Sequence, residues 1–435
     1  MTISPSQPLL LQQVLVLEGP SQDPRPQDVL LEQGRIKVLG GDCLEQAMTA
    51  GCAVLPASEL LLAPALIDPH SELVDPQSGV AENLASLERS AIAAGYGVVA
   101  LLPKAISWRD TPEQLQPLQR RTDLQMPLWG SFSRAGAGHE LAPHADQLAA
   151  GAVGLADGDD CPALALLERG LTLGEMERAP LLLAPRDARL SQDGFVREGV
   201  EALRAGWPMD PPTSETIPLQ NLLALAERHP DCRLQLMNLS TAQAVAQLRQ
   251  LAPQQRPEAT VCWWHLLADI GSLDPIAEGW RMRPPLGTPA DRRALKQALS
   301  EGLISAVAVH HQALDPEEQL LPLDQRQPGV AGHRFVLPAL WQELIVRDGW
   351  SIQALWQALC FGPAALLNLP APRLQVGSNN WLLFDPNRHW SAREDSEAPQ
   401  AANQPYGRAS LCGQVIAAGL NPELWREPSA GDRRS

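Results

Sequence analysis

Polar residues that could do chemistry follow several short apolar runs of this sequence. The run ending at Ile67 leads into Asp68, His70 and Glu72. Because side chains alternate along a strand, His70 and Glu72 point to the same side. An imidazole and a carboxylate placed together in this way could bind a metal ion or a polar ligand.

Further candidates follow later apolar runs. Lys104 carries a point charge that could attract an anion. Asp157 could be a metal ligand, although a run of acids such as Asp157, Asp159 and Asp160 is more often a solvated loop that caps a helix. His310 could act as a general base, because an imidazole titrates near neutral pH.

The apolar runs that precede these residues alternate with helical patterns. We interpret eight runs as buried strands: 60–67, 97–102, 126–132, 152–156, 180–184, 233–239, 259–264 and 303–309. Between them, the ranges 81–94, 217–228, 241–251 and 290–301 are predicted helices, the last opening with the capping signal Thr288-Pro289. Strands covered on both faces by crossover helices are near-continuously apolar, so the pattern predicts a (β/α)₈ barrel of the TIM type. A doubly wound open sheet is the alternative.

The two ends of the chain have a different pattern from the middle. Residues 1–60 and 371–426 contain short β-like runs separated by turns, and we expect them to join into one small accessory β-sheet. The barrel is assigned to residues 61–370, with helices 335–346 and 352–359 packed outside it. Residues 427–435 are predicted to be a frayed tail.

Composition excludes several classes of function. Acidic residues outnumber basic ones by 50 to 34, and the net charge of -16 repels nucleic acid and anionic lipid. The seven cysteines are scattered and form no C-x-x-C pair, which is typical of a reducing compartment. No apolar run is long enough for a membrane helix. We expect a cytoplasmic protein that binds neither nucleic acid nor membranes; a homo-oligomer is left open.

One motif carries a specific resemblance. The segment L-A-P-A-L-I-D-P-H, which ends at His70, resembles the P-G-L-I-D-x-H-x-H-x-R strand of the dihydroorotase branch of the amidohydrolase superfamily. The likeness continues in the family's order, for example at L-S-T-A (239–242), P-P-L (284–286) and P-G-V-A-G (328–332). This family implies metal-assisted hydrolysis of a cyclic amide, which reversibly links carbamoyl-aspartate and dihydroorotate. Zinc lowers the pKa of a bridging water, and an aspartate on strand eight moves the proton.

The sequence departs from the family pattern at most of the metal ligands. Glu72 replaces the second histidine of strand one, Ala184 the histidine of strand five, and Asn238 the histidine of strand six. Asp157 could fill the place on strand four, where none of the three lysines lies. The resemblance therefore leaves His70, Glu72 and Asp157 as residual metal positions. We favour the interpretation that His70 is a remnant of the family's metal site and binds no metal ion, because the other ligands of that site are missing.

The substrate clamp of the family is altered as well. Val74 and Gly287 stand where the family has arginines, and Lys104 replaces an asparagine. Lys104 and Asn238 remain as candidate substrate-binding residues. His310, at the position of the family aspartate, is the candidate catalytic residue. Near these positions lie large indoles and an arginine: Trp207, Trp263, Trp264, Trp280 and Arg281. They indicate either a new apolar pocket or the plugging of an abandoned one, and we favour plugging.

Together these features predict a dihydroorotase-like protein of the pyrimidine biosynthesis family that is non-catalytic and needs no cofactor. By analogy with the family, it would be a structural or regulatory partner of aspartate carbamoyltransferase. The alternative is an active dihydroorotase, or a related zinc-dependent cyclic amidohydrolase, with an atypical site built from His70, Glu72, Asp157 and His310. A third possibility is a module that binds a ligand through Lys104 and Arg186 without converting it.

Overall fold

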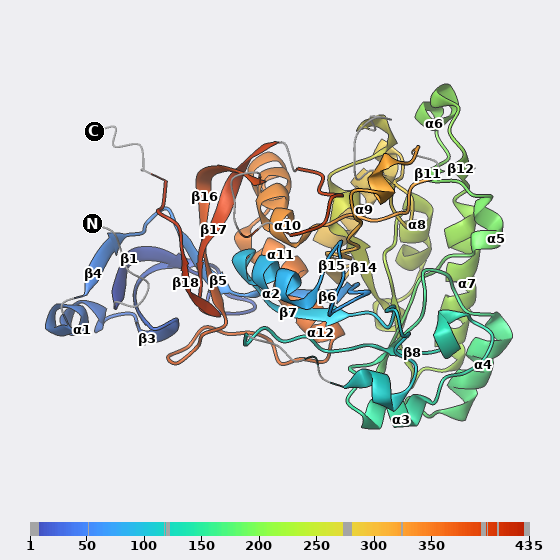
Figure 1. Ribbon diagram of the computed structural model, residues 1–435, viewed down its shortest axis with the longest axis horizontal. Helices are drawn as coiled ribbons and strands as arrows, with labels where there is room; N and C mark the ends of the chain where they lie inside the picture. Colours follow the sequence, from blue (N-terminus) through green and yellow to red (C-terminus); the bar gives the residue numbers. More distant parts are fainter. Residues whose placement is uncertain are drawn as a thin grey trace.

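A computed structural model describes residues 8–50, 52–116, 118, 122–272, 281–322, 325–392, 397, 399–406 and 409–429. The chain forms two units, a barrel and a β-sheet that packs beside it. Figure 1 shows the sheet at one end of the long axis and the barrel at the other. No described helix is long and apolar enough to cross a membrane.

Eight short parallel strands form the barrel within the described part of the chain. They are β6 (Leu66–Ser71), β7 (Tyr96–Leu101), β8 (Gly130–Ser131), β9 (Leu155–Ala156), β10 (Pro180–Leu183), β13 (Arg233–Leu236), β14 (Glu258–Cys262) and β15 (Ala306–Ala308). Parallel pairing joins β6 to β7 and runs from β8 through β15, and a bridge between Leu101 and Leu128 connects the two groups. The ring closes where the backbone N of His310 donates to the carbonyl of His70 at 3.2 Å. The predicted (β/α)₈ barrel is therefore confirmed, and the open sheet is excluded.

Helices cover the outside of the barrel between its strands. They are α2 (Leu84–Ala93), α3 (His144–Ala149), α4 (Leu164–Leu173), α7 (Thr213–Arg228), α8 (Ala242–Gln250) and α9 (Pro289–Ser300). The predicted start of α9 is confirmed, because the Thr288 hydroxyl accepts from Asp291 N while the Asp291 side chain accepts from Thr288 N. Short 3₁₀ turns lie at Pro112–Leu115, Arg134–Gly136, Pro253–Gln255, Trp263–Leu266, Ile270–Ser272 and Glu318–Leu320.

An excursion separates β10 from α7. It contains α5 (Ala188–Ser191), β11 (Val196–Arg197), α6 (Val200–Ala205) and β12 (Met209–Asp210), and α6 stands at the far end of the molecule in Figure 1. After β15, α10 (His333–Leu340) continues as a π-helical segment, Trp341–Arg347. Then α11 (Ile352–Trp356) leads through a second π segment, Gln357–Phe361, into α12 (Gly362–Leu366). The predicted helices 335–346 and 352–359 correspond to these two runs.

The accessory sheet is built from both ends of the chain, as predicted. Its strands are β1 (Leu9–Val16), β2 (Arg25–Glu32), β3 (Arg35–Leu39), β4 (Ala53–Pro56), β5 (Leu61–Pro64), β16 (Trp381–Ser391), β17 (Ser410–Ala418) and β18 (Asn421–Trp425). Their order is β18-β17-β16-β5-β1-β2-β3, with β4 beside β1. The short helix α1 (Cys43–Ala50) contacts β1 and β2. A buried cluster centred on β1, β5 and β16 forms a small core of its own.

The predicted strand 60–67 was wrong in one respect, because it spans two strands of two different sheets. β5 pairs with β1 and β16 in the accessory sheet, whereas β6 begins the barrel. The chain crosses at Ala65, whose N donates to the carbonyl of Asn380 at 3.2 Å. Both strands are buried throughout, so the apolar sequence does not show where the chain passes from one sheet to the other.

The end of the chain is described only in part. Of the predicted tail 427–435, residues 427–429 are described, and the Ser429 backbone N donates to Asp385 Oδ2 at 2.7 Å. Residues 430–435 lie outside the described part. The first strand of the C-terminal segment, β16, runs on to Ser391 and is longer than the short β-like runs that we expected there.

Candidate active site at the barrel mouth

Two histidines face each other at the carboxyl ends of β6 and β15. The Nδ1 atoms of His70 and His310 lie 3.2 Å apart, and the Nε2 of His70 lies 2.9 Å from the hydroxyl of Thr260. Both rings are buried. His310 adopts a left-handed backbone conformation with φ of 47°, which turns the chain at the end of β15. The structure therefore brings the predicted metal position His70 and the predicted catalytic residue His310 into direct contact.

Burial keeps both imidazoles neutral. It lowers the pKa of His70 well below the usual value, and the neighbouring His310 lowers it further. Burial also lowers the pKa of His310, although Glu72 and Asp159 act in the opposite direction. Since one proton can occupy the contact between the two Nδ1 atoms, one ring donates and the other accepts. Neither ring nitrogen of His70 is then left over for a metal ion.

Glu72 is held in an ion pair. Lys104 Nζ lies 2.9 Å from one carboxylate oxygen of Glu72 and 3.2 Å from the other, and Gln312 donates to the same carboxylate at 2.7 Å. Burial would lower the pKa of Lys104, but Glu72 and Asp159 outweigh it and raise that pKa. The predicted metal position Glu72 and the predicted substrate residue Lys104 thus neutralise each other.

Asp157 lies apart from these groups. The hydroxyl of Ser133 approaches both of its carboxylate oxygens, at 2.9 and 2.8 Å. Burial raises the pKa of Asp157 to about 6. On the neighbouring strand ends, Ala184 has no donor atom and Asn238 offers only an amide. These positions bring no third ligand to His70.

The residues present do not fit a zinc ion. Zinc in proteins takes about four converging donors from Cys, His, Asp or Glu. Among the residues that the structure describes, no three such side chains form a group that could hold a metal ion. His70, Glu72 and Asp157, which the sequence left as residual metal positions, do not form such a group either.

Asp68 has a structural role that the sequence did not reveal. Its carboxyl group accepts from the backbone N of Val309 at 3.0 Å and contacts His333 Nε2 at 2.9 Å. It also accepts from the hydroxyl of Ser71. Asp68 is buried completely, and these bonds tie β6 to β15 and to the start of α10. Asp68 was visible in the family motif, but no spacing in the sequence pointed to His333.

A cavity opens beside the histidines, at the ends of β9, β10 and β13. Its empty space amounts to about 300 Å³, including open solvent at its mouth. The lining residues are Asp159, Ala184, Pro185, Arg186, Arg197, Glu215, Met237, Asn238, Arg283, Pro284 and His310. The structure therefore places the predicted residues Asn238 and His310 at one cavity, whereas Lys104 and Asp157 are absent from its lining.

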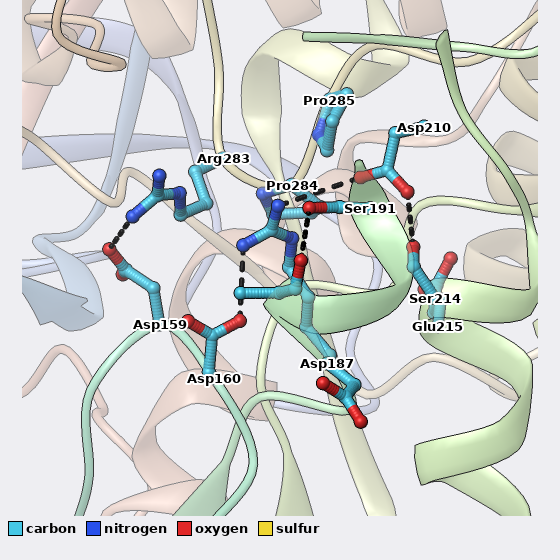
Figure 2. A network of polar contacts seen from close by, with 12 residues as sticks. Asp159, Asp160, Asp187, Ser191, Asp210, Ser214, Glu215, Arg283, Pro284 and Pro285 are labelled. Atoms are coloured by element: carbon cyan, nitrogen blue, oxygen red, sulfur yellow. Dashed lines mark hydrogen bonds and ion pairs between the residues drawn. The ribbon is translucent and has the colours of Figure 1, made fainter. Parts of the chain in front are cut away.

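Arginine–aspartate pairs border this cavity. Arg283 Nη1 lies 3.2 Å from Asp159, and Arg186 Nη1 lies 3.1 Å from Asp160. Figure 2 shows Arg283 meeting Asp159 on the left, with Asp160 below this pair and Asp210 on the right. Burial raises the pKa of Asp160, whereas Lys104 and Arg283 overcome burial and lower the pKa of Asp159. The sequence had treated these acids as a solvated loop, and the arginine partners come from distant segments.

A buried network surrounds Arg197, one of the residues that line the cavity. Its guanidinium contacts Asp210 at 3.1 Å and Glu215 at 3.3 Å, and the hydroxyl of Ser240 accepts from it at 2.9 Å. Burial raises the pKa of Glu215, against the effect of Arg197. These residues fix the excursion between β10 and α7 to the barrel. No motif in the sequence pointed to this network.

Two of the large indoles belong to the core beside the cavity. Trp263 is completely buried and Trp264 is 3% exposed, and both pack in the main hydrophobic cluster. The ring of Trp264 meets that of Tyr406 at 5.5 Å. Neither indole lines the cavity. Trp280 lies outside the described residues.

Comparison with known proteins places the chain in a family. A probable dihydroorotase-like protein from Synechocystis is 34% identical over 405 residues, which cover 85% of this chain and 90% of that protein. A dihydroorotase from Syntrophotalea carbinolica is 27% identical, and a dihydroorotase-like protein from Pseudomonas aeruginosa is 28% identical; each match covers 89% of this chain and 92% of the relative. A scan against protein-family models gave no match.

Solved structures agree on the fold. The L-hydantoinase of Arthrobacter aurescens superposes with a TM-score of 0.75 at 16% identity, covering 94% of both chains. A D-hydantoinase gives a TM-score of 0.72 over 94% of this chain and 93% of the other. The resemblance identified from the sequence is therefore confirmed: the chain belongs to the dihydroorotase-like proteins of the amidohydrolase superfamily.

Proposed function

We propose that this chain is a non-catalytic member of its family, which acts as a structural or regulatory partner of an enzyme of pyrimidine biosynthesis. Aspartate carbamoyltransferase is the partner that the family analogy favours. The residual ligands at the barrel mouth are then bonded to other protein groups and not to a metal ion.

The observation that supports this proposal is the engagement of every residual ligand. His70 is bonded on both ring nitrogens, Glu72 is paired with Lys104, and Asp157 is bonded by Ser133. A zinc ion would have to break these contacts and would still gain few donors. Changing even one ligand or its supporting partner costs a metal site roughly 10- to 100-fold in affinity or activity.

Metal content and turnover test the absence of catalysis. We expect purified protein, stripped with a chelator and reloaded with zinc, to retain far less than one zinc ion per chain. It should also fail to convert dihydroorotate or carbamoyl-aspartate. A genuine dihydroorotase treated in parallel serves as the positive control. Stoichiometric zinc together with turnover that is lost in His70→Ala would overturn the proposal in favour of an atypical dihydroorotase.

Co-purification tests the partner role. Tagged protein isolated from its own cell extract should carry aspartate carbamoyltransferase in a fixed ratio that survives gel filtration. The same purification with an unrelated tagged barrel protein controls for adhesion. If the enzyme is absent, and purified aspartate carbamoyltransferase also fails to bind the purified chain, the partner role is refuted.

A further inference from the structure

Exposed apolar side chains gather on loops around the barrel mouth. Among the described residues, fifteen large apolar side chains are exposed, and five of them lie on the three loops that follow β6, β7 and β15. We call these five side chains the apolar rim: Val74, Val80, Ile106, Leu320 and Leu321. Single exposed apolar residues are ordinary on a protein surface, whereas a concentration of them marks a site of interaction.

The three loops are neighbours in the barrel and contact one another. β6 pairs with β7, and β15 closes the ring against β6. The backbone N of Ile106 donates to the carbonyl of Val74 at 3.0 Å, which joins the first two loops. The backbone N of Glu72 donates to the carbonyl of His311 at 2.9 Å, which joins the first loop to the third. The apolar rim therefore lies on adjoining loops at one end of the barrel.

Side chains that are themselves well packed hold these loops in place. Arg109 is buried, and it donates to one carbonyl after β7 at 2.7 Å and to one carbonyl after β6 at 3.3 Å. In the third loop, the side chain of Asn403 accepts from Leu314 N at 3.0 Å, and Arg326 Nε donates to the carbonyl of Leu321 at 2.7 Å. A partner that binds the apolar rim has little backbone to order, which lowers the entropic cost of binding.

The same loops carry an excess of negative charge. Eight acidic residues and two basic ones lie within 72–83, 102–116 and 312–322. Both basic residues are engaged, Lys104 with Glu72 and Arg109 with backbone carbonyls. Among the acids, Glu113 and Glu317 are exposed. A second copy of this face would bring acid against acid, and anionic lipid or nucleic acid would be repelled, so the charge favours a basic partner.

We propose that the apolar rim is the docking surface for a protein partner whose own contact surface is an apolar patch ringed by lysine or arginine side chains. The apolar patch covers the five side chains of the rim, and the surrounding cations face the acids of the three loops. The inference rests on the proposed partner role and adds the surface that makes the contact. An enzyme whose substrate enters at the barrel mouth must leave this end open, whereas a chain that converts nothing can be covered there.

Photo-crosslinking in the protein's own cells tests where the partner lies. The full-length chain carries a benzophenone amino acid in place of Ile106 or of Leu320, and in place of Met48 as the matched control. Met48 is 83% exposed, as Leu320 is, but it lies on α1 beside the accessory sheet. We expect both rim positions to link the same protein, through an apolar peptide flanked by lysine or arginine, and Met48 not to link it. A link between two copies of this chain, no link at either rim position, or equal linking at Met48 overturns the proposal.

Affinity measurements with the purified linked protein test the individual contacts. Leu320→Lys places a cation within the apolar rim, and Glu317→Lys reverses one charge beside it in the sequence. Each should weaken the complex by about 10-fold or more, and added salt should weaken the complex of the natural chain. Met48→Lys is the control and should bind as the natural chain does. Unchanged affinity in both rim variants refutes the assigned surface.

Both substituted side chains are exposed, so the variants should fold as the natural chain does, and thermal unfolding checks this. The identity of the linked protein is a separate result. If it is not aspartate carbamoyltransferase, the docking surface stands and the partner named in the proposed function is wrong. If aspartate carbamoyltransferase binds both rim variants with undiminished affinity, the partner role stands and the docking surface is refuted.

Discussion

Removing the carboxyl group of Asp68 should open the barrel between its first and last strands. Asp68 is completely buried, and it accepts from Val309 N at 3.0 Å, from His70 N at 3.4 Å and from the hydroxyl of Ser71. It also contacts His333 Nε2 at 2.9 Å. Asp68→Ala removes all four contacts at once and leaves their donors buried without an acceptor.

The magnitude follows from the number of donors left unsatisfied. Losing a hydrogen bond to a charged group costs about 1.5–3 kcal/mol. The bonds from Val309 and His333 have good geometry and lie in the interior, so Asp68→Ala should lower the free energy of unfolding by about 3–6 kcal/mol. Asp68→Asn keeps one acceptor for Val309, while the other contacts can reorient, and it should cost about 1–3 kcal/mol.

Urea unfolding followed by tryptophan fluorescence measures these losses, and amide exchange at Val309 and His310 locates them. Asp75→Asn is the matched control. Asp75 also accepts three local hydrogen bonds, from Gln77 N and from the N and Oγ of Ser78, but it does so at the surface, where water can replace them. We expect the control to change stability little. If Asp68→Ala is as stable as the control, or if exchange at Val309 is not accelerated, the reasoning about barrel closure is refuted.

Three further predictions concern other buried groups. Burial raises the pKa of Asp157 to about 6. Between about pH 4 and pH 6 the folded chain therefore keeps a proton that the unfolded chain releases, and the free energy of unfolding falls as the pH rises. Asp157→Asn should remove about 3 kcal/mol of this pH dependence, measured by urea unfolding at several pH values. Burial lowers the pKa of His265 to about 4, so the free energy of unfolding falls as the pH falls from about 6.5 to 4. His265→Gln should remove about 3 kcal/mol of this loss. An unchanged pH profile in the Asp157 or His265 variant contradicts the direction assigned to that residue. In Gly332→Ala the new Cβ would lie 2.6 Å from Nε1 of Trp263, which should cost about 1–3 kcal/mol and alter the fluorescence. Gly41→Ala, with no atom within 4 Å of the new Cβ, is its control and should leave both the stability and the fluorescence unchanged.

The barrel was predictable because buried parallel strands have a recognisable composition. Runs such as 97–102 and 180–184 are apolar and short, and helical patterns lie between such runs. The same property concealed the boundary between the two units at Ala65. Strands on both sides of it are buried on both faces, so hydrophobicity does not change where the chain passes from the accessory sheet into the barrel. The pairing of β5 with β1 and with the distant β16 fixes the assignment.

The candidate site was predictable at the strand ends but not across the cavity. His70 and His310 could be placed at the barrel mouth, because residues at the carboxyl ends of barrel strands converge there. The partners that decide their chemistry come from elsewhere. Arg283 reaches Asp159 from a loop 124 residues away, and His333 reaches Asp68 across 265 residues. Side-chain pairs at such separations leave no pattern in a single sequence.

The ion pairs at the mouth explain how buried acidic residues are accommodated there without a metal ion. A carboxylate buried without a partner is costly, so a buried acid that faces no metal ion needs a cation or a hydrogen-bond donor from the protein. Lys104 meets this need for Glu72, and Arg283 meets it for Asp159. A substitution that adds one metal donor, for example Ala184→His, would leave Glu72 paired with Lys104 and Asp159 paired with Arg283. Metal binding would therefore require that these internal cations be removed as well as ligands added, so single substitutions to the family's ligand residues should bind no more zinc than the natural chain does.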